Sequence, residues 1–142
     1  MTRFLLDVNV LISLLDPTHV HHERAHRWFE GISPRGWLSC PTTQNGVVRI
    51  VCNPRYSNSQ PTQLVCDSLE SLLRAGQHEF VPDSISLLGP YIDRAHLLNS
   101  SQVTDSYLLA LAVHHGAHLA TFDTRLVTSS VRRGSEAIAT IR

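Results

Sequence analysis

Short apolar runs alternate with longer amphipathic stretches along this chain. The apolar runs lie at residues 4–6, 37–40, 79–81, 118–123 and 137–141. In the stretches between them, apolar residues recur every three or four positions, which is typical of helices that cover a sheet. Short apolar runs separated by such helices predict the buried strands of a parallel sheet.

Start and stop signals divide the intervening stretches into helices. We expect these helices at residues 10–15, 19–31, 44–52, 62–75, 83–96 and 106–115, followed by a short helix or turn over 126–131. Gly89-Pro90 should break or kink the helix over 83–96, because proline cannot continue a regular helix. Gly116 should end the last long helix in a left-handed conformation. The predicted fold class is therefore α/β, with a parallel, doubly wound sheet of four to five strands.

Length and composition predict one folded domain over residues 1–142, with 42% hydrophobic residues to form its core. No apolar stretch reaches the roughly 18 residues of a membrane-spanning helix. The acid at position 7 comes too soon for a signal peptide. Three cysteines without C-x-x-C spacing argue against a zinc ribbon and fit a reducing cytosol. We therefore expect a cytoplasmic protein with no membrane partner.

The formal net charge of the chain is zero, and its Lys and Arg positions are all arginine. The chain has twelve arginines and no lysine. The planar guanidinium group is well suited to binding phosphate. A GC-rich genome, which favours arginine codons, explains the same bias, so both interpretations stay open.

Three aspartates stand where a site is expected in such a sheet. Asp7 ends the first predicted strand, Asp123 ends the fourth, and Asp105 opens the helix that leads into the fourth. Sites in open α/β sheets form at the carboxyl ends of the strands, so these side chains are expected to meet at one edge. Crowded carboxylates repel one another unless a cation neutralises them, and hard oxygen ligands favour Mg²⁺ or Mn²⁺. Together with arginine, this cluster indicates hydrolysis of phosphodiester bonds.

Each acid also has a simpler explanation. Asp7 and Asn9 are common helix-capping residues. Asp105 at a helix start complements the helix dipole by about 0.3–1 kcal/mol. Asp123 followed by Thr124 is typical of a turn. Singly, these explanations are the more frequent ones, and only the convergence of three acids on one edge favours a site.

Four sequence blocks together resemble the PIN-domain ribonucleases. They are LDVNVLI at 6–12, CPTTQNGVVR at 40–49, TDSYLLALA at 104–112 and LATFD at 119–123. The likeness is greatest to the VapC-type toxins of type II toxin–antitoxin systems. It implies a three-layer α/β/α PIN-like fold and a Mg²⁺- or Mn²⁺-dependent endoribonuclease acting on tRNA or another structured RNA. It also implies a homodimer and a small antitoxin protein whose tail covers the active site.

The resemblance carries over residue by residue. The acidic metal-site positions of the family match Asp7, Asp105 and Asp123. Nearby polar positions, which orient ligands or water, match Asn9 and Thr121. The candidates for RNA contacts are Arg49, on a basic position of the family, with Arg55 and Arg125.

One position departs from the family. Its second acid is usually a glutamate that follows a threonine, and here Thr43 is followed by Gln44. Glutamine has nearly the same shape, but it cannot ionise or act as a general base. Gln44 is still a catalytic candidate, and three interpretations stay open. The site works with three acids, it is weakened, or it has been inactivated by replacement.

Two other functions compete with RNA cleavage. The first is a PIN-like module that binds RNA or an antitoxin without cutting, which the loss of the glutamate favours. The second is a zinc protease, because His22-Glu23-Arg24-Ala25-His26 matches H-E-x-x-H. No later segment offers a clear third zinc ligand, and a protease would leave the three aspartates unexplained.

Overall fold

The computed structural model describes residues 2–142. One parallel sheet contains β1 (Phe4–Leu6), β2 (Trp37–Ser39), β3 (His78–Phe80), β4 (His118–Thr121) and β5 (Ile138–Thr140). The helices are α1 (Val8–Leu15), α2 (His22–Ile32), α3 (Pro41–Val51), α4 (Thr62–Leu72) and α5 (Val103–His114). The strand order is β3-β2-β1-β4-β5, with every pairing parallel. The prediction of a parallel, doubly wound sheet is confirmed, with five strands.

The order of the strands creates a switch point between β1 and β4. From β1 the chain moves to β2 and β3 on one side, and it then returns through α5 to β4 and β5 on the other. Leu6 pairs with Ala120, so the two central strands end side by side. Open α/β sheets bind ligands in the crevice outside the carboxyl ends of their strands at such a point.

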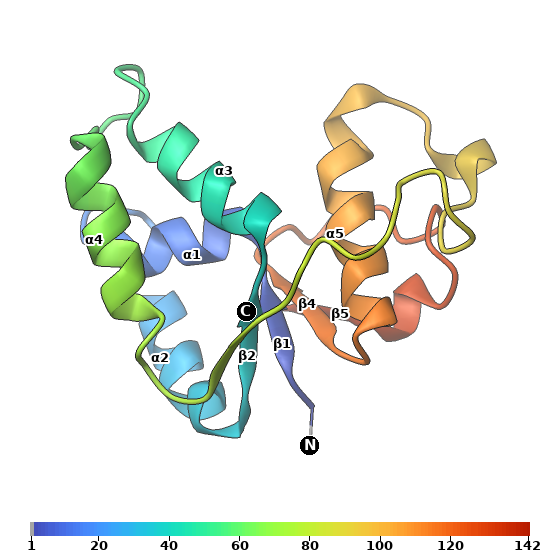
Figure 1. The fold of residues 1–142 in the computed structure, drawn as a ribbon, viewed down its shortest axis with the longest axis horizontal. Helices are drawn as coiled ribbons and strands as arrows, with labels where there is room; N and C mark the ends of the chain where they lie inside the picture. Colours follow the sequence, from blue (N-terminus) through green and yellow to red (C-terminus); the bar gives the residue numbers. More distant parts are fainter. Residues whose placement is uncertain (1) are drawn as a thin grey trace.

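Helices cover both faces of the sheet (Figure 1). Helices α1 to α4, coloured blue to green, lie on one side, and α5 lies on the other with the irregular segment that precedes it. Side chains alternate along the strands in agreement with this division. Leu6 belongs to the apolar core shared with α1–α4, and Leu5 belongs to the core shared with α5. The architecture is therefore the three-layer α/β/α arrangement expected from the resemblance.

Helices α1 and α3 lie close together beside the end of β1. Helix α3 begins at Pro41, earlier than predicted, because proline is favoured at the first helical position. The N–H of Cys40 donates to Thr43 Oγ1 at 3.0 Å, which fixes the entry into this helix. Gly46 allows the close approach, since a Cβ there would lie 2.9 Å from Val8 Cγ2.

The predicted helix over 83–96 is wrong. Residues 83–93 form turns and irregular backbone, followed by a single 3₁₀ turn, η2 (Arg94–His96). Gly89-Pro90 interrupts the backbone hydrogen bonds that a helix would need. Of the apolar residues that suggested the helix, Leu88 is exposed, whereas Ile92 is buried and Leu87 packs against the core, so the segment is apolar on one side without being helical. By contrast, Gly116 ends α5 with φ +64°, as predicted.

None of the helices within residues 2–142 is long and apolar enough to cross a membrane.

Candidate functional site

Asp7 lies at the junction of β1 and α1. Its N–H donates to the carbonyl oxygen of Ala120 (3.1 Å), which continues the pairing of β1 with β4. Its Oδ1 accepts the N–H of Asn9 (3.1 Å), so Asp7 caps α1 as the simpler explanation expected. Asp7 is only 6% exposed. Asp7 Oδ1 therefore caps α1, and Asp7 Oδ2 is available to a second partner.

Thr121, the last residue of β4, is that second partner. Its Oγ1 donates to Asp7 Oδ2 (2.9 Å) and accepts the backbone N–H of Asp123 (3.0 Å). Thr121 is 1% exposed, and its hydrogen bond to Asp7 is buried, whereas the one from Asp123 is part-buried. One hydroxyl thus holds Asp7 and the backbone of Asp123 at the same point of the sheet edge.

The third acid, Asp105, lies in the first turn of α5. Burial raises its pKa to about 6, and repulsion from Asp7 and Asp123 acts in the same direction. The pKa of Asp7 is raised as well, chiefly by burial. Hydrogen bonds from Asn9 and Thr121 oppose this rise, and repulsion from Asp123 adds to it. The three predicted acids therefore share one electrostatic environment at the switch point.

The negative charge of this cluster has no cationic partner in the described chain. None of the ion pairs within residues 2–142 involves Asp7, Asp105 or Asp123. Over the same residues, no three His, Cys, Asp or Glu side chains converge closely enough to hold a metal ion as they are placed. The three acids are thus near enough to repel one another, but their side chains are not arranged as the ligands of one metal ion. Uncompensated carboxylate oxygens of this kind fit a divalent cation such as Mg²⁺ or Mn²⁺.

Gln44 and Asn9 contribute less directly to the cluster. Gln44 is half-buried in α3, and its Nε2 donates to Ser39 Oγ (3.0 Å) at the end of β2. Asn9 is exposed, and its contact with Asp7 is made by the backbone N–H. The structure therefore brings the three aspartates and Thr121 together, while the amide of Gln44 is engaged by another partner.

The three candidate arginines are all exposed, but only one lies next to the acids. The backbone N–H of Arg125 donates to Asp123 Oδ1 (2.8 Å). Arg49 lies in the last turn of α3, five residues beyond Gln44, which corresponds to about 7.5 Å along the helix axis. Arg55 lies farther on, in the loop between α3 and α4.

An aromatic and cationic cluster beside Asp123 was not predicted. His21 stacks on Phe122 with ring centroids 4.5 Å apart, and the guanidinium carbon of Arg24 lies 4.8 Å from the centre of the Phe122 ring. Arg24 Nη2 donates to His21 Nδ1 (2.9 Å). The cluster packs the start of α2 against Phe122, which lies between Thr121 and Asp123 in the sequence. No local pattern signals it, because the partners come from opposite ends of the sequence.

The histidines of the H-E-x-x-H match have structural partners. His22 Nδ1 lies 2.7 Å from the carbonyl oxygen of Ser13, and His26 Nε2 lies 2.9 Å from that of Leu14. Both carbonyls belong to the last turn of α1, where no helical N–H is available to them. Each ring nitrogen therefore donates a hydrogen bond that caps the end of α1. This contact accounts for the motif without zinc.

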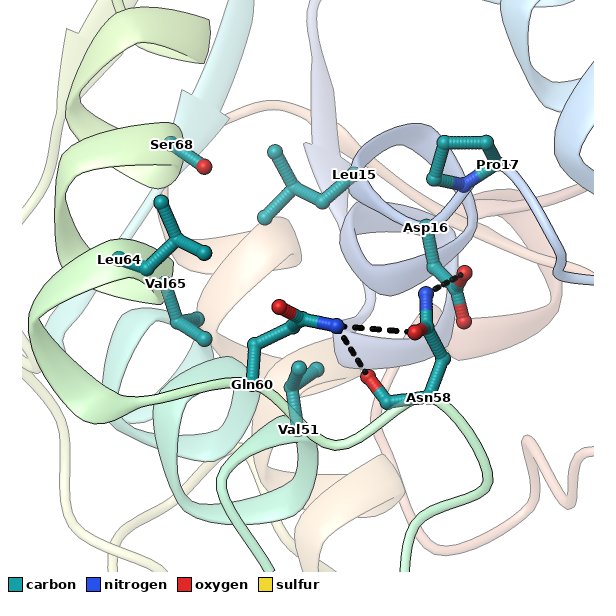
Figure 2. Close-up of a pocket in the computed structure, with 9 residues that line it drawn as sticks. All are labelled: Leu15, Asp16, Pro17, Val51, Asn58, Gln60, Leu64, Val65 and Ser68. Carbon is teal, nitrogen blue, oxygen red and sulfur yellow. Dashed lines mark hydrogen bonds between the residues drawn. The ribbon is translucent and has the colours of Figure 1, made fainter.

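The hollow shown in Figure 2 is lined by none of the three clustered aspartates. It measures about 230 Å³ and lies between the end of α1, the loop after α3, and α4. Asp16 on its wall accepts hydrogen bonds from Thr18, Tyr56 and Asn58, and Gln60 donates to Asn58. Burial tends to raise the pKa of Asp16, but these hydrogen bonds outweigh it and hold the pKa below its usual range. Asp16 thus anchors the loop.

Sequence comparison places this chain in a known family. The chain matches the PIN domain over residues 4–129. It is 46% identical to Ribonuclease VapC44 of Mycobacterium tuberculosis over 130 residues, which cover 91% of this chain and 92% of that protein. Ribonuclease VapC39 of the same species is 41% identical over 128 residues, with coverages of 89% and 92%.

Solved structures share the fold at low sequence identity. VapC20 of M. tuberculosis, a toxin that cleaves the sarcin–ricin loop, has a TM-score of 0.65 and 9% identity over 91% of this chain and 96% of its own. FitAcB of Neisseria gonorrhoeae has a TM-score of 0.64 and 21% identity over 95% of both chains. A toxin–antitoxin complex from Klebsiella pneumoniae has a TM-score of 0.58 and 19% identity over 97% of both. With the family match and the two ribonucleases above 40% identity, the chain belongs to the PIN-domain family, among its VapC-type toxins.

Proposed function

We propose that this protein is a metal-dependent endoribonuclease, the toxin of a type II toxin–antitoxin module, which hydrolyses tRNA or another structured RNA. One observation carries the proposal: Asp7, Asp105 and Asp123 lie near enough to repel one another at the switch point of the sheet, without a counter-ion in the described chain. Relatives of more than 40% identity are named ribonucleases, which supports the reaction class. The acids supply the site at which that reaction takes place.

The chemistry follows from the three acids and their partners. Asp7, Asp105 and Asp123 would hold Mg²⁺ or Mn²⁺, which activates water and offsets the charge on the leaving oxygen. The N–H of Asn9 and the hydroxyl of Thr121 each occupy one lone pair of Asp7, so its orientation is set before a ligand arrives. Burial is the main cause of the raised pKa of Asp105, and repulsion from Asp7 and Asp123, which a cation would relieve, adds to it. We assign no protein side chain as general base.

Exposed arginines would hold the RNA backbone around this acidic centre. Arg125 is the best placed, because its own N–H contacts Asp123. Arg49 and Arg55 follow along and beyond α3, where they would contact phosphates farther from the cut bond. This arrangement suits a structured RNA that extends over more than the cleaved nucleotide.

We also propose two protein partners. The first is a small cognate antitoxin whose tail covers the acidic edge, and the toxin–antitoxin complex from K. pneumoniae supports it by its fold. The second is another copy of this chain, a homodimer that rests on the family resemblance. Light scattering of the purified protein tests the homodimer, and a monomer at every concentration would contradict it.

One observation favours a second candidate function. Gln44 replaces the glutamate of the family, and its amide is bound to Ser39. A site weakened in this way would bind RNA or antitoxin without cutting. The binding module would use the same RNA- and antitoxin-binding surfaces as the ribonuclease, but it would not cleave the RNA.

Cleavage of labelled tRNA and of total RNA, with the new ends mapped, separates the two candidates. We expect cleavage in Mn²⁺ or Mg²⁺ that is lost with a chelator and in Asp7→Asn. RNA that binds the wild-type protein but is never cut would favour the binding module. Cleavage retained in Asp7→Asn would contradict the proposed site.

A further inference from the structure

Three hydrogen-bonding side chains connect α3 to the β3 side of the sheet. Gln44 Nε2 donates to Ser39 Oγ (3.0 Å), and Ser39 Oγ lies 2.8 Å from His78 Nε2. Ser39 is fully buried at the end of β2, while Gln44 and His78 are half-buried. In the site described above Ser39 is only the partner of Gln44, and His78 has no part in it.

The single hydroxyl proton of Ser39 sets the direction of this chain. Gln44 donates to Ser39 Oγ, and among the described residues His78 Nε2 is the one other hydrogen-bond partner of this buried hydroxyl. If the hydroxyl donates its proton there, rather than leaving it without an acceptor, His78 is neutral with its proton on Nδ1. The surroundings of His78 favour the neutral ring. Its ring centroid lies 4.5 Å from that of Trp37. Burial lowers the pKa of His78, although the charge of Glu79 acts in the opposite direction.

The other tautomer of His78 would reverse the amide. With the proton on Nε2, His78 would donate to Ser39, and Ser39 would donate to the carbonyl oxygen of Gln44. The NH₂ group of Gln44 would then point away from Ser39. An NH₂ group repels a cation, whereas a carbonyl oxygen is a ligand for Mg²⁺ and Mn²⁺. The tautomer of His78 thus decides which end of Gln44 is free.

The start of α3 lies at the sheet edge that carries Asp7. Helix α3 follows β2 directly, and β2 pairs in parallel with β1, so both strands end at this edge. Gly46 in α3 contacts Val8, the residue after Asp7. Within residues 2–142 the carbonyl oxygen of Gln44 accepts no side-chain hydrogen bond, so it remains available.

We propose that Ser39 and His78 are positioning residues that hold the amide of Gln44 in one orientation, with its carbonyl oxygen available as a neutral oxygen donor beside the aspartates. The inference rests on the proposed function, because the donor is directed at the cation of that site. It explains how glutamine serves at a position that carries glutamate in the family. Partners of this kind, which orient a donor without touching the metal, commonly change metal affinity by about 10–100-fold when they are removed.

The first test reads the tautomer directly in the metal-free protein. Nitrogen-15 spectra of the imidazole ring of His78 distinguish a protonated Nδ1 from a protonated Nε2. We expect the proton on Nδ1, together with a Gln44 amide proton that exchanges slowly in the wild type and quickly in Ser39→Ala. A proton on Nε2 would mean that the amide is reversed, and it would overturn the proposal.

The second test is a double-mutant cycle with Mn²⁺ titrated by calorimetry. We expect Ser39→Ala to lower the Mn²⁺ affinity by about 10-fold in the wild-type background and to have no effect in Gln44→Leu. Ser13→Ala removes an equally buried hydroxyl, bonded to Val10 within α1, and serves as the matched control. An unchanged affinity in Ser39→Ala, or an equal loss in both backgrounds, would show that the chain only ties α3 to the sheet.

Mn²⁺ binding distinguishes a wrong positioning role for Ser39 from a wrong metal site. If the wild-type protein binds Mn²⁺ and Asp7→Asn does not, but Ser39→Ala binds like the wild type, the positioning inference is wrong and the proposed metal site stands. If the wild-type protein binds no Mn²⁺, both are wrong.

Discussion

Thr121 and Asp7 lie 114 positions apart in the sequence and share a buried hydrogen bond of 2.9 Å. The bond crosses from β4 to β1 at the point where the order of the strands reverses. The same threonine hydroxyl accepts the N–H of Asp123. The orientation of Asp7 therefore depends on a side chain that is distant in sequence but adjacent in the sheet.

This relationship predicts different results for two substitutions of Thr121. Thr121→Val keeps the shape but removes the hydroxyl, so we expect the free energy of unfolding to fall by about 1–3 kcal/mol. We expect the Mn²⁺ affinity to fall by about 10-fold, because Asp7 loses its orienting partner. Thr121→Ser keeps the hydroxyl and should retain the affinity. Calorimetry and urea unfolding measure the two effects, and a Thr121→Val protein with wild-type affinity would contradict this role.

The contact between α1 and α3 predicts the effect of adding one methyl group. In Gly46→Ala the new Cβ would lie 2.9 Å from Val8 Cγ2, so we expect a loss of about 1–3 kcal/mol in the free energy of unfolding. Gly31→Ala is the matched control in α2, since nothing lies within 4 Å of its Cβ. That variant should gain about 0.5–1 kcal/mol from the lower flexibility of the unfolded chain. Chemical denaturation measures both, and equal effects would contradict the close approach.

Asp16 predicts how stability changes with pH. Its pKa in the folded protein is lower than its ordinary value of 3.8, because hydrogen bonds from Tyr56, Asn58 and Thr18 outweigh the effect of burial. The charged form is thus favoured by folding, so its stabilisation is complete above pH 3.8 and is lost as the pH falls toward the folded pKa. We expect Asp16→Asn to be less stable than the wild type near neutral pH, by about 1–3 kcal/mol. The difference should shrink below pH 3.8 in urea unfolding curves, and a constant difference would contradict the assignment.

The histidines of the H-E-x-x-H match predict a loss of stability without a loss of activity. His22→Ala leaves the carbonyl oxygen of Ser13 without its donor, and we expect a cost of about 1 kcal/mol in thermal unfolding. RNA cleavage at a temperature where the variant is folded should match the wild type. Zinc in the purified protein, or cleavage abolished by this substitution, would contradict the structural role.

Local patterns located the strand ends near Asp7 and Asp123, although β4 ends at Thr121, two residues before Asp123. Asp7 and Asp123 follow apolar runs, and parallel strands bring their carboxyl ends to one edge whatever the details of packing. The alternation of strands and helices also determined the α/β class. Both inferences use only short-range patterns and a general rule of topology.

The failures have two physical causes. The predicted helix over 83–96 is interrupted locally by Gly89-Pro90, although Ile92 is buried and Leu87 packs against the core. The other cause is dependence on distant partners. Ser39 and His78 meet only because β2 and β3 pair in one particular register. Such contacts depend on side-chain direction and register, which no local pattern in the sequence reveals.

Titration of Mn²⁺ into the wild-type protein and into Asp105→Asn tests the central claim most directly. We expect the wild-type protein to bind Mn²⁺ and to be stabilised by it against heat, because the ion neutralises three carboxylates that otherwise repel one another. The Asp105→Asn protein should be folded without metal and should lose most of the affinity and of the thermal stabilisation. Equal Mn²⁺ affinity in the two proteins, or no binding to either, would contradict a metal centre formed by Asp7, Asp105 and Asp123.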